Sequence, residues 1–183
     1  MQNNSEIELK VDLNDICEQL LFVMEEIFMN TPTGTCYLMG NCLAEGLANA
    51  GLVAKEVTGS LILKDTNGRN VVYGAKRFGG TNVGNYHTWC EVEYDDETLI
   101  IDPSVRFNRK YLKAHSVKLN QKTPDIIISN AHNTWLHSYY PDLRLVAQSK
   151  HYLDMVDEDV VEHLKTVIHV RALQQLALLE FGI

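Results

Sequence analysis

The chain has 183 residues, 45% of them hydrophobic and 22% charged, which suits one domain over residues 1–183 with a substantial core. Its formal net charge of −8 argues against a nucleic-acid groove or an anionic membrane surface as a partner. No apolar run approaches the roughly 20 residues of a membrane-spanning helix, so we expect neither nucleic-acid nor membrane binding.

The first predicted element is an amphipathic helix over residues 9–29. Its apolar residues recur at helical spacing, and its acidic residues lie elsewhere around the axis. Asp12 can cap this helix, with Asp15 in a weaker version of the capping box. Cys17 borders the apolar face, so we interpret it as a core residue.

A nearly all-apolar helix, Cys36 to Ala50, follows a loop over residues 30–35 that Pro32 interrupts. A helix that is apolar on most sides is buried, and Gly51 is a suitable stop. Cys36 therefore begins a central helix, where unpaired N–H groups and the positive end of the helix dipole favour a thiolate. A small buried core cysteine is the alternative interpretation.

Two strands joined by a hairpin turn are predicted next, over residues 53–64 and 71–73. The turn is Asp-Thr-Asn-Gly at 65–68. Gly59 marks a bulge or a close approach of another backbone. The glycine-rich segment from 74 to 85 fits no phosphate-binding fingerprint, so we interpret it as a mobile connection that borders a cleft.

A strand over 86–94 is predicted to carry His87 and Trp89 on one face and Cys90 on the other. A second strand over 98–102 follows a turn. Beyond it we expect a helical turn at 111–115, a helix over 126–140 around Trp135, and a long helix over 157–181. These last elements follow from apolar spacing and from the acidic start of the final helix.

The cysteines and histidines give no metal signature. Cys17, Cys36, Cys42 and Cys90 form no Cys-x-x-Cys pair, and the histidine spacings do not match a helix-borne metal pair. The polar N-terminus lacks a signal-peptide pattern. We therefore expect reduced thiols in the cytoplasm, no metal and no cofactor, while export by a route without a cleaved signal stays compatible with the sequence.

A thiol, an imidazole and a carboxylate could form a nucleophilic triad from Cys36, His87 and Asp102. A five-residue loop centred near Asp95 would place Asp102 beside His87. A tight turn at 96–97 would leave the two about four residues out of register, roughly 13 Å along the strand. The triad therefore requires a wide loop or a bulge. A structural histidine and a strand-end aspartate are the alternatives.

Three sequence blocks occur in order: Gly34–Cys36 before the central helix, Gly-Leu-Val-Ala-Lys-Glu-Val-Thr-Gly at 51–59, and His-Thr-Trp-Cys-Glu-Val at 87–92 with Leu-Ile-Ile-Asp-Pro-Ser at 99–104. The order, spacing and residue types resemble the transglutaminase-like superfamily of papain-type folds. The resemblance covers about Thr33 to Val105, well under half of the chain.

The resemblance implies an α+β fold in which a buried helix packs its N-terminal cysteine against an antiparallel sheet that carries the histidine and the aspartate. The catalytic core would span about 30–105, with extra C-terminal helices in 106–183. By position, Cys36 is the nucleophile, His87 the general base and Asp102 the orienting acid.

The implied reaction is attack of the Cys36 thiolate on a carbonyl, giving a thioester that water or an amine resolves. The backbone N–H of Cys36 is the natural first oxyanion donor. The second donor is open, and Trp89 is either a wall of the acyl tunnel or a core residue. The candidates for the second donor are Asn30, Asn85, Thr33 and Thr35.

We therefore predict a thiol hydrolase, a cysteine peptidase or amidase or a glutamine deamidase, acting on a peptide, a protein or a small amide. A protein-glutamine transglutaminase or an amine acyltransferase is the alternative reaction, although the Arg-Gly-Gly that leads into the cysteine of arylamine acetyltransferases is missing. A non-catalytic binding module on the same fold is the alternative of another class. The sequence leaves the oligomeric state open.

Overall fold

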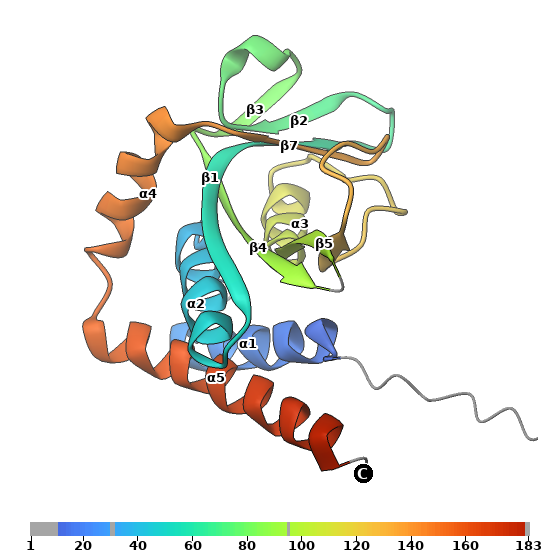
Figure 1. The fold of residues 1–183 in the computed structure, drawn as a ribbon. Coiled ribbons are helices and arrows are strands. Elements are labelled where there is room, and N and C mark those ends of the chain that lie inside the picture. The colour runs from blue at the N-terminus through green and yellow to red at the C-terminus, as the bar shows by residue number, and fades with distance from the viewer. Residues whose placement is uncertain (1–10, 30–31, 95, 182–183) are drawn as a thin grey trace, which may run out of the picture.

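The structure, a computed structural model, describes residues 11–29, 32–94 and 96–181, which fold as an α+β unit (Figure 1). Its helices are α1 (Leu13–Phe28), α2 (Cys36–Asn49), α3 (Val105–Ala114), α4 (Val146–Leu153) and α5 (Glu158–Phe181), with short 3-10 turns at Lys76–Phe78 and Leu143–Leu145. Its strands are β1 (Val53–Lys64), β2 (Asn70–Tyr73), β3 (Thr81–Gly84), β4 (His87–Tyr94), β5 (Glu97–Asp102), β6 (Ile127–Ser129) and β7 (His137–Pro141).

The sheet runs in the order β3-β2-β1-β4-β5-β6, and β7 also pairs with β1. All pairs are antiparallel except β2 with β3. The long strand β1 pairs with different strands along its length. Its first half pairs with β4, and its second half pairs with β2 and β7. Gly59 lies where these meet, and a Cβ there would fall 2.1 Å from the Tyr140 carbonyl oxygen. The expected close backbone approach at Gly59 is confirmed.

Helix α2 is the centre of the molecule, as its apolar sequence predicted. It packs on one face of the sheet, with α1 and α5 on its other sides (Figure 1). Cys90, on this face of β4, belongs to the same hydrophobic cluster, whereas Trp89 belongs to a second cluster that includes residues of β2, β7 and α3. The alternation predicted for this strand is therefore confirmed.

The N-terminal half of the chain follows the predicted elements closely. Helix α2 begins at Cys36 and is followed by Gly51 at φ +94°. Asp12 caps α1 by accepting a 3.0 Å hydrogen bond from the Asp15 backbone N–H. The segment from 74 to 85 contains β3 as well as a loop, so it is more regular than expected.

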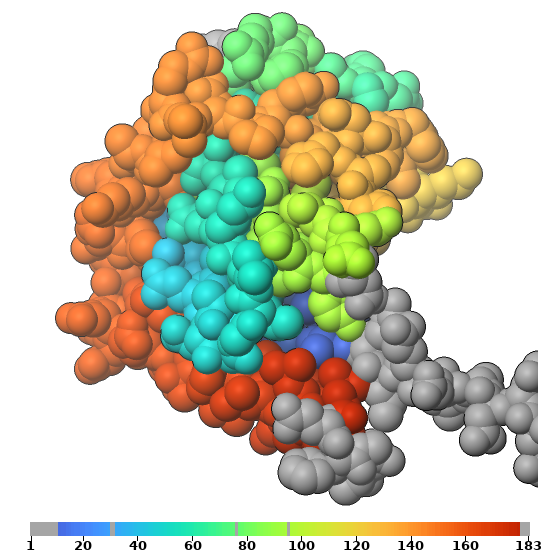
Figure 2. Space-filling view, viewed as in Figure 1, coloured from blue at the N-terminus to red at the C-terminus, as the bar shows by residue number. Residues whose placement is uncertain are grey.

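The helix predicted over 126–140 is wrong. That segment forms β6 and β7, which pair with β5 and β1, and Trp135 is exposed between them. Ile126 to Ile128 are β-branched and gain more from pairing at a sheet edge than from a helix. Helix α4 was not predicted, and in Figure 2 its orange surface runs down one side of the molecule. None of the described helices is long and apolar enough to cross a membrane.

Candidate active site

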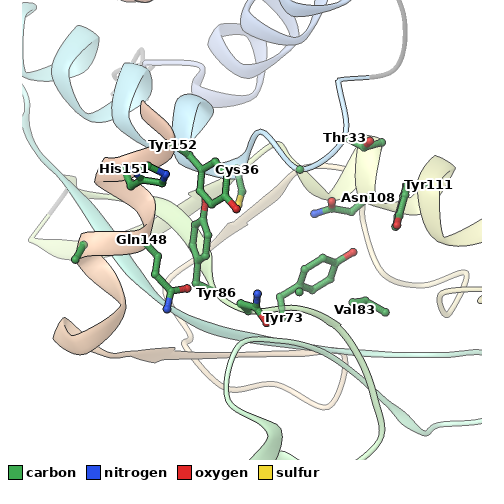
Figure 3. A pocket seen from close by; sticks show the side chains of 14 residues that line it. Thr33, Cys36, Tyr73, Val83, Tyr86, Asn108, Tyr111, Gln148, His151 and Tyr152 are labelled. Carbon is green, nitrogen blue, oxygen red and sulfur yellow. The ribbon is translucent and has the colours of Figure 1, made fainter. Parts of the chain in front are cut away.

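A pocket of about 750 Å³ opens at the N-terminal end of α2 (Figure 3). Its walls come from the start of α2, the β2–β4 segment, α3 and α4. Cys36 lies in its lining and is 8% exposed. The lining is aromatic and amide-rich, and none of the Asp, Glu, Lys or Arg side chains that the structure describes contributes to it.

The first turn of α2 is open to a ligand at Cys36. The N-cap residue, Thr35, makes no side-chain capping hydrogen bond, and its hydroxyl donates to the Pro32 carbonyl oxygen at 2.6 Å. The backbone N–H groups that start the helix therefore have no side-chain cap, and together with the helix dipole they favour negative charge. This is a suitable environment for a thiolate and for an oxyanion formed beside it.

A glycine fixes the distance between α2 and the sheet. A Cβ at Gly40 would lie 2.8 Å from the Thr88 side chain and 3.2 Å from the Trp89 backbone nitrogen. Only a residue without a side chain allows this close packing. Because Gly40 is one helical turn from Cys36, the contact with β4 also places the thiol near the strand that begins at His87.

The structure brings His87 and Asp102 into contact. His87 Nε2 and Asp102 Oδ2 are 2.7 Å apart, and both side chains are fully buried. The last pair of the β4–β5 hairpin is Tyr94 with Glu97, so only two residues connect the strands. The expectation that the triad needs a wide loop or a bulge is therefore wrong.

The contact is diagonal across the two strands. The register pairs Cys90 with Ile101, which places Asp102 opposite Trp89, two residues from His87 on the same face. Diagonal neighbours lie about 7–8 Å apart at the backbone, which an imidazole and a carboxylate span together. The tight hairpin thus places the two residues within reach without any irregularity in the strands.

Asp102 is held from three sides. Its Oδ1 accepts hydrogen bonds from the Ser104 backbone N–H at 3.0 Å and the Ser104 hydroxyl at 2.6 Å. Its Oδ2 accepts one from the Tyr139 hydroxyl at 2.8 Å, besides the contact with His87. Burial raises the pKa of Asp102, but His87 and these donors outweigh it and leave the pKa below its usual value.

His87 lies in an aromatic cage. Its ring centroid is 5.6 Å from that of Tyr73, 6.3 Å from that of Tyr139 and 6.4 Å from that of Trp89. Burial lowers the pKa of His87, but the charges of Asp102 and Cys36 more than offset this and raise it to about 10. The imidazole is thus held in its charged form.

The two ring nitrogens of His87 have different partners. Nε2 is engaged by Asp102, whereas Nδ1 is buried and has no hydrogen-bond partner among the residues that the structure describes. Cys36 is close enough to raise the pKa of His87. Nδ1 is therefore the nitrogen left to exchange a proton with Cys36 or with a ligand beside it.

The other candidate residues lie in different surroundings. Asn85 and Thr33 line the pocket, and Asn85 is exposed to solvent. Trp89 is fully buried, donates its indole N–H to Glu91 at 3.2 Å and does not line the pocket. Asn30 lies outside the described residues.

Several residues that contribute to this site were missed by sequence reasoning. The Tyr139 hydroxyl, on β7, donates a hydrogen bond to Asp102. Helix α4 contributes Gln148, His151 and Tyr152 to the pocket wall. The alternation His-Ser-Tyr-Tyr-Pro over 137–141, with residues 137 and 139 buried, could have indicated the strand that carries Tyr139.

A buried polar side chain on helix α4 makes hydrogen bonds to the sheet. Ser149 is its buried residue, and the Ser149 hydroxyl lies 2.9 Å from the Thr88 hydroxyl and 3.4 Å from Glu56. Thr88 in turn lies 3.0 Å from the Thr58 hydroxyl on β1. This network connects the pocket wall to the strand that begins at His87.

Comparisons with known proteins bear on the fold. No protein-family model matches the sequence, and none of the curated proteins matches it. A solved structure, the crystal structure of a genomics target, has a similar fold with a TM-score of 0.56 and 13% sequence identity, covering 90% of this chain and 82% of that one. Within the described residues, no group of three His, Cys, Asp or Glu side chains is placed to hold a metal ion.

Proposed function

We propose that this protein is a thiol acyl-transfer enzyme of the transglutaminase-like, papain-type class, and that it hydrolyses an amide bond through a thioester on Cys36. One observation carries the proposal: a buried Asp102–His87 pair lies beside a cysteine that starts a central helix and lines a pocket. Nucleophile, base and orienting acid are the three parts that covalent amide hydrolysis needs.

The geometry supports a two-step reaction. The Cys36 sulfur adds to the amide carbonyl carbon, and the backbone N–H of Cys36 binds the resulting oxyanion. The His87 imidazolium gives its Nδ1 proton to the amine nitrogen, the C–N bond breaks, and the thioester remains. Neutral His87 then takes a proton from water as the water oxygen attacks the thioester, and release of the acid restores the thiolate–imidazolium pair.

The pocket favours an uncharged acyl group. Four of the chain's eight tyrosines line it, together with Asn85, Asn108 and Gln148, and no Asp, Glu, Lys or Arg among the described residues does so. Burying a charged side chain without a partner carries a large free-energy penalty, whereas amide and aromatic surfaces accept a neutral one.

Acyl p-nitroanilides test this preference because they share one leaving group. We expect kcat/KM for an N-acetyl-glutaminyl anilide to exceed that of the glutamyl and lysyl anilides by about tenfold or more, since one unpaired charge in the pocket costs at least ~1.4 kcal/mol. The readout is p-nitroaniline release at pH 7. Faster turnover of the glutamyl or lysyl compound would contradict the neutral-substrate assignment.

Alkylation by iodoacetamide tests the proposed function itself. Labelling of Cys36, read by intact mass, should be fast below pH 7, because the proposed reaction uses a Cys36 thiolate paired with the His87 imidazolium. The His87→Ala variant should label slowly, with a midpoint near ~8.5, the value of a free thiol.

The chain supplies its own controls for this experiment. Burial raises the pKa of Cys42 and of Cys90 to about 12, and that of Cys17 well above its usual value. These three thiols should stay unlabelled at neutral pH. Equal labelling of Cys36 and Cys17, or a wild-type profile identical to that of His87→Ala, would sink the catalytic proposal and leave a binding module on this fold.

The acyl acceptor separates the two enzyme alternatives. A transglutaminase or amine acyltransferase would resolve the thioester with an added primary amine in preference to water, which incorporation of a labelled amine into a glutamine peptide reports. Because the reaction needs a reduced thiol and all four cysteines are free, we propose a reducing compartment such as the cytoplasm.

A further inference from the structure

Tyr73 carries a buried hydroxyl whose partner is missing. The residue is 8% exposed and lines the pocket with Cys36 (Figure 3). Its hydroxyl has no hydrogen-bond partner among the residues that the structure describes. Burying a hydroxyl without a hydrogen-bond partner destabilises the fold, so an unpaired donor inside a pocket indicates a ligand that accepts a hydrogen bond from it.

The ring of Tyr73 is held firmly in place. Tyr73 pairs with Leu61 at the end of β2, and its ring packs against His87. On another side lies Gly84, where a Cβ would fall 3.0 Å from the Tyr73 ring. A donor fixed before the substrate arrives needs no reorganisation during the reaction, and this is the property that oxyanion stabilisation requires.

The Tyr73 hydroxyl keeps its proton at any physiological pH. Burial raises its pKa far above the usual value for tyrosine, and Cys36 raises it further. Tyr73 and Cys36 line the same pocket. The Tyr73 hydroxyl is therefore a permanent hydrogen-bond donor in the pocket that contains Cys36.

Four other candidate donors in the described part of the chain are occupied or solvated. The Thr35 hydroxyl donates to the Pro32 carbonyl, and the Trp89 indole N–H donates to Glu91. Asn108 donates its amide to the Ser104 hydroxyl at 3.3 Å. Asn85 lies at the exposed rim, where water weakens its hydrogen bonds.

We propose that the Tyr73 hydroxyl is the second oxyanion donor: it donates a hydrogen bond to the acyl oxygen when the Cys36 sulfur adds to the carbonyl carbon. The first donor is the backbone N–H of Cys36. This inference rests on the proposed acyl-transfer function, and Tyr73 is then a catalytic residue because its hydroxyl touches the reacting group.

Two reagents that react with the Cys36 thiol distinguish an oxyanion donor from a residue that only affects the reactivity of the thiol. p-Nitrophenyl acetate acylates Cys36 through a tetrahedral oxyanion and releases p-nitrophenolate, whereas iodoacetamide alkylates the sulfur by direct displacement of iodide without an oxyanion. Tyr73→Phe should slow the p-nitrophenolate burst by about 10²-fold. The rate of iodoacetamide alkylation should stay within about twofold of wild type, since that reaction makes no use of the donor.

The variant also has a distinctive stability. Because the hydroxyl has no partner in the described chain, Tyr73→Phe removes an unsatisfied polar group, so its thermal midpoint should equal or exceed that of wild type. A structural hydroxyl would lower it. Tyr140→Phe, on a ring that stacks on Phe78 outside the pocket, is the matched control and should change neither rate.

The outcomes are separable. An unchanged burst in Tyr73→Phe, or equal slowing of the burst and of alkylation, overturns the oxyanion assignment while leaving the triad intact. A wild-type Cys36 that iodoacetamide does not label selectively overturns the proposed function, and this inference with it. A slower burst with unchanged alkylation supports the assignment.

Discussion

Asp102→Asn is expected to slow thioester formation from p-nitrophenyl acetate by about 10⁴-fold at pH 7, although the substitution changes only one oxygen into an NH₂ group. The reason lies in the hydrogen bonds of Asp102. The Ser104 backbone N–H and hydroxyl both donate to Oδ1, whereas Oδ2 accepts from the Tyr139 hydroxyl, which can turn and accept instead. The oxygen of the new amide therefore takes the Oδ1 position. The amide NH₂ then faces His87.

That orientation fixes the neutral imidazole of His87 in one tautomer. The amide NH₂ donates to Nε2, which must accept, so the ring proton moves to Nδ1, the nitrogen left to exchange with Cys36. A protonated Nδ1 cannot take the thiol proton, and the neutral amide no longer stabilises an imidazolium. Both effects remove the thiolate, which explains why the expected loss is large.

A surface Asp→Asn change isolates this effect. Asp159→Asn, in the exposed first turn of α5, should leave the burst rate unchanged. The burst rate of Asp102→Asn should also stay low up to about pH 8, because a neutral imidazole cannot replace the lost ion pair. A burst within tenfold of wild type would show that Asp102 is structural and that His87 works without it.

The local parts of this site could be predicted from sequence. Apolar spacing and Gly51 defined the central helix, so the position of Cys36 at its start follows from residues within one segment. Alternation along 86–94 likewise separated the face of His87 from that of Cys90. These features depend on neighbours along the chain, where sequence patterns carry most information.

The register of the hairpin was the first point where such reasoning failed. Asp95, Asp96 and Glu97 contain no glycine, so nothing in the sequence selects a two-residue turn, yet Asp96 adopts φ 61°. The prediction also left out a diagonal contact between residues two positions out of register. The diagonal contact of His87 with Asp102 shows that two side chains can meet while their backbones are offset by two positions.

The C-terminal half of the site depends on contacts between distant segments. Tyr139 reaches Asp102 only because β7 pairs with β1, more than 70 residues earlier in the chain. Helix α4 borders the pocket through contacts with Thr88 and Tyr86 from β4 and its approach, and its own apolar pattern is weak. No local pattern encodes these contacts.

The buried ion pair should also be visible in stability, because the free energy of unfolding is expected to fall as pH rises from 6.5 to about 10. The folded-state pKa of His87 is raised from 6.5 to about 10, so over this range the folded chain binds the proton that the unfolded chain has lost. The stabilisation from His87 is therefore complete below pH 6.5 and disappears as pH passes 10. A shift of this size corresponds to roughly 5 kcal/mol.

Urea unfolding of wild type and His87→Gln at several pH values between 5 and 10 measures this contribution. The difference between the two proteins is the relevant quantity, because the buried thiols of Cys17, Cys42 and Cys90 also favour unfolding at alkaline pH and cancel in it. His151→Gln, at an exposed position in the pocket wall, should reproduce the wild-type pH dependence. A difference that does not shrink between pH 6.5 and 10 would contradict a charged His87.

At acidic pH, the free energy of unfolding depends on Asp102. Its folded-state pKa is lowered from 3.8, so its contribution is present above pH 3.8 and disappears as pH falls through the lower folded value. The pair is therefore most stabilising between about pH 4 and 6.5 and is still largely formed at neutral pH. An imidazolium that is already paired before substrate binds holds the proton that the leaving amine requires, so the charge state that stabilises the fold is also the one that starts the proposed reaction.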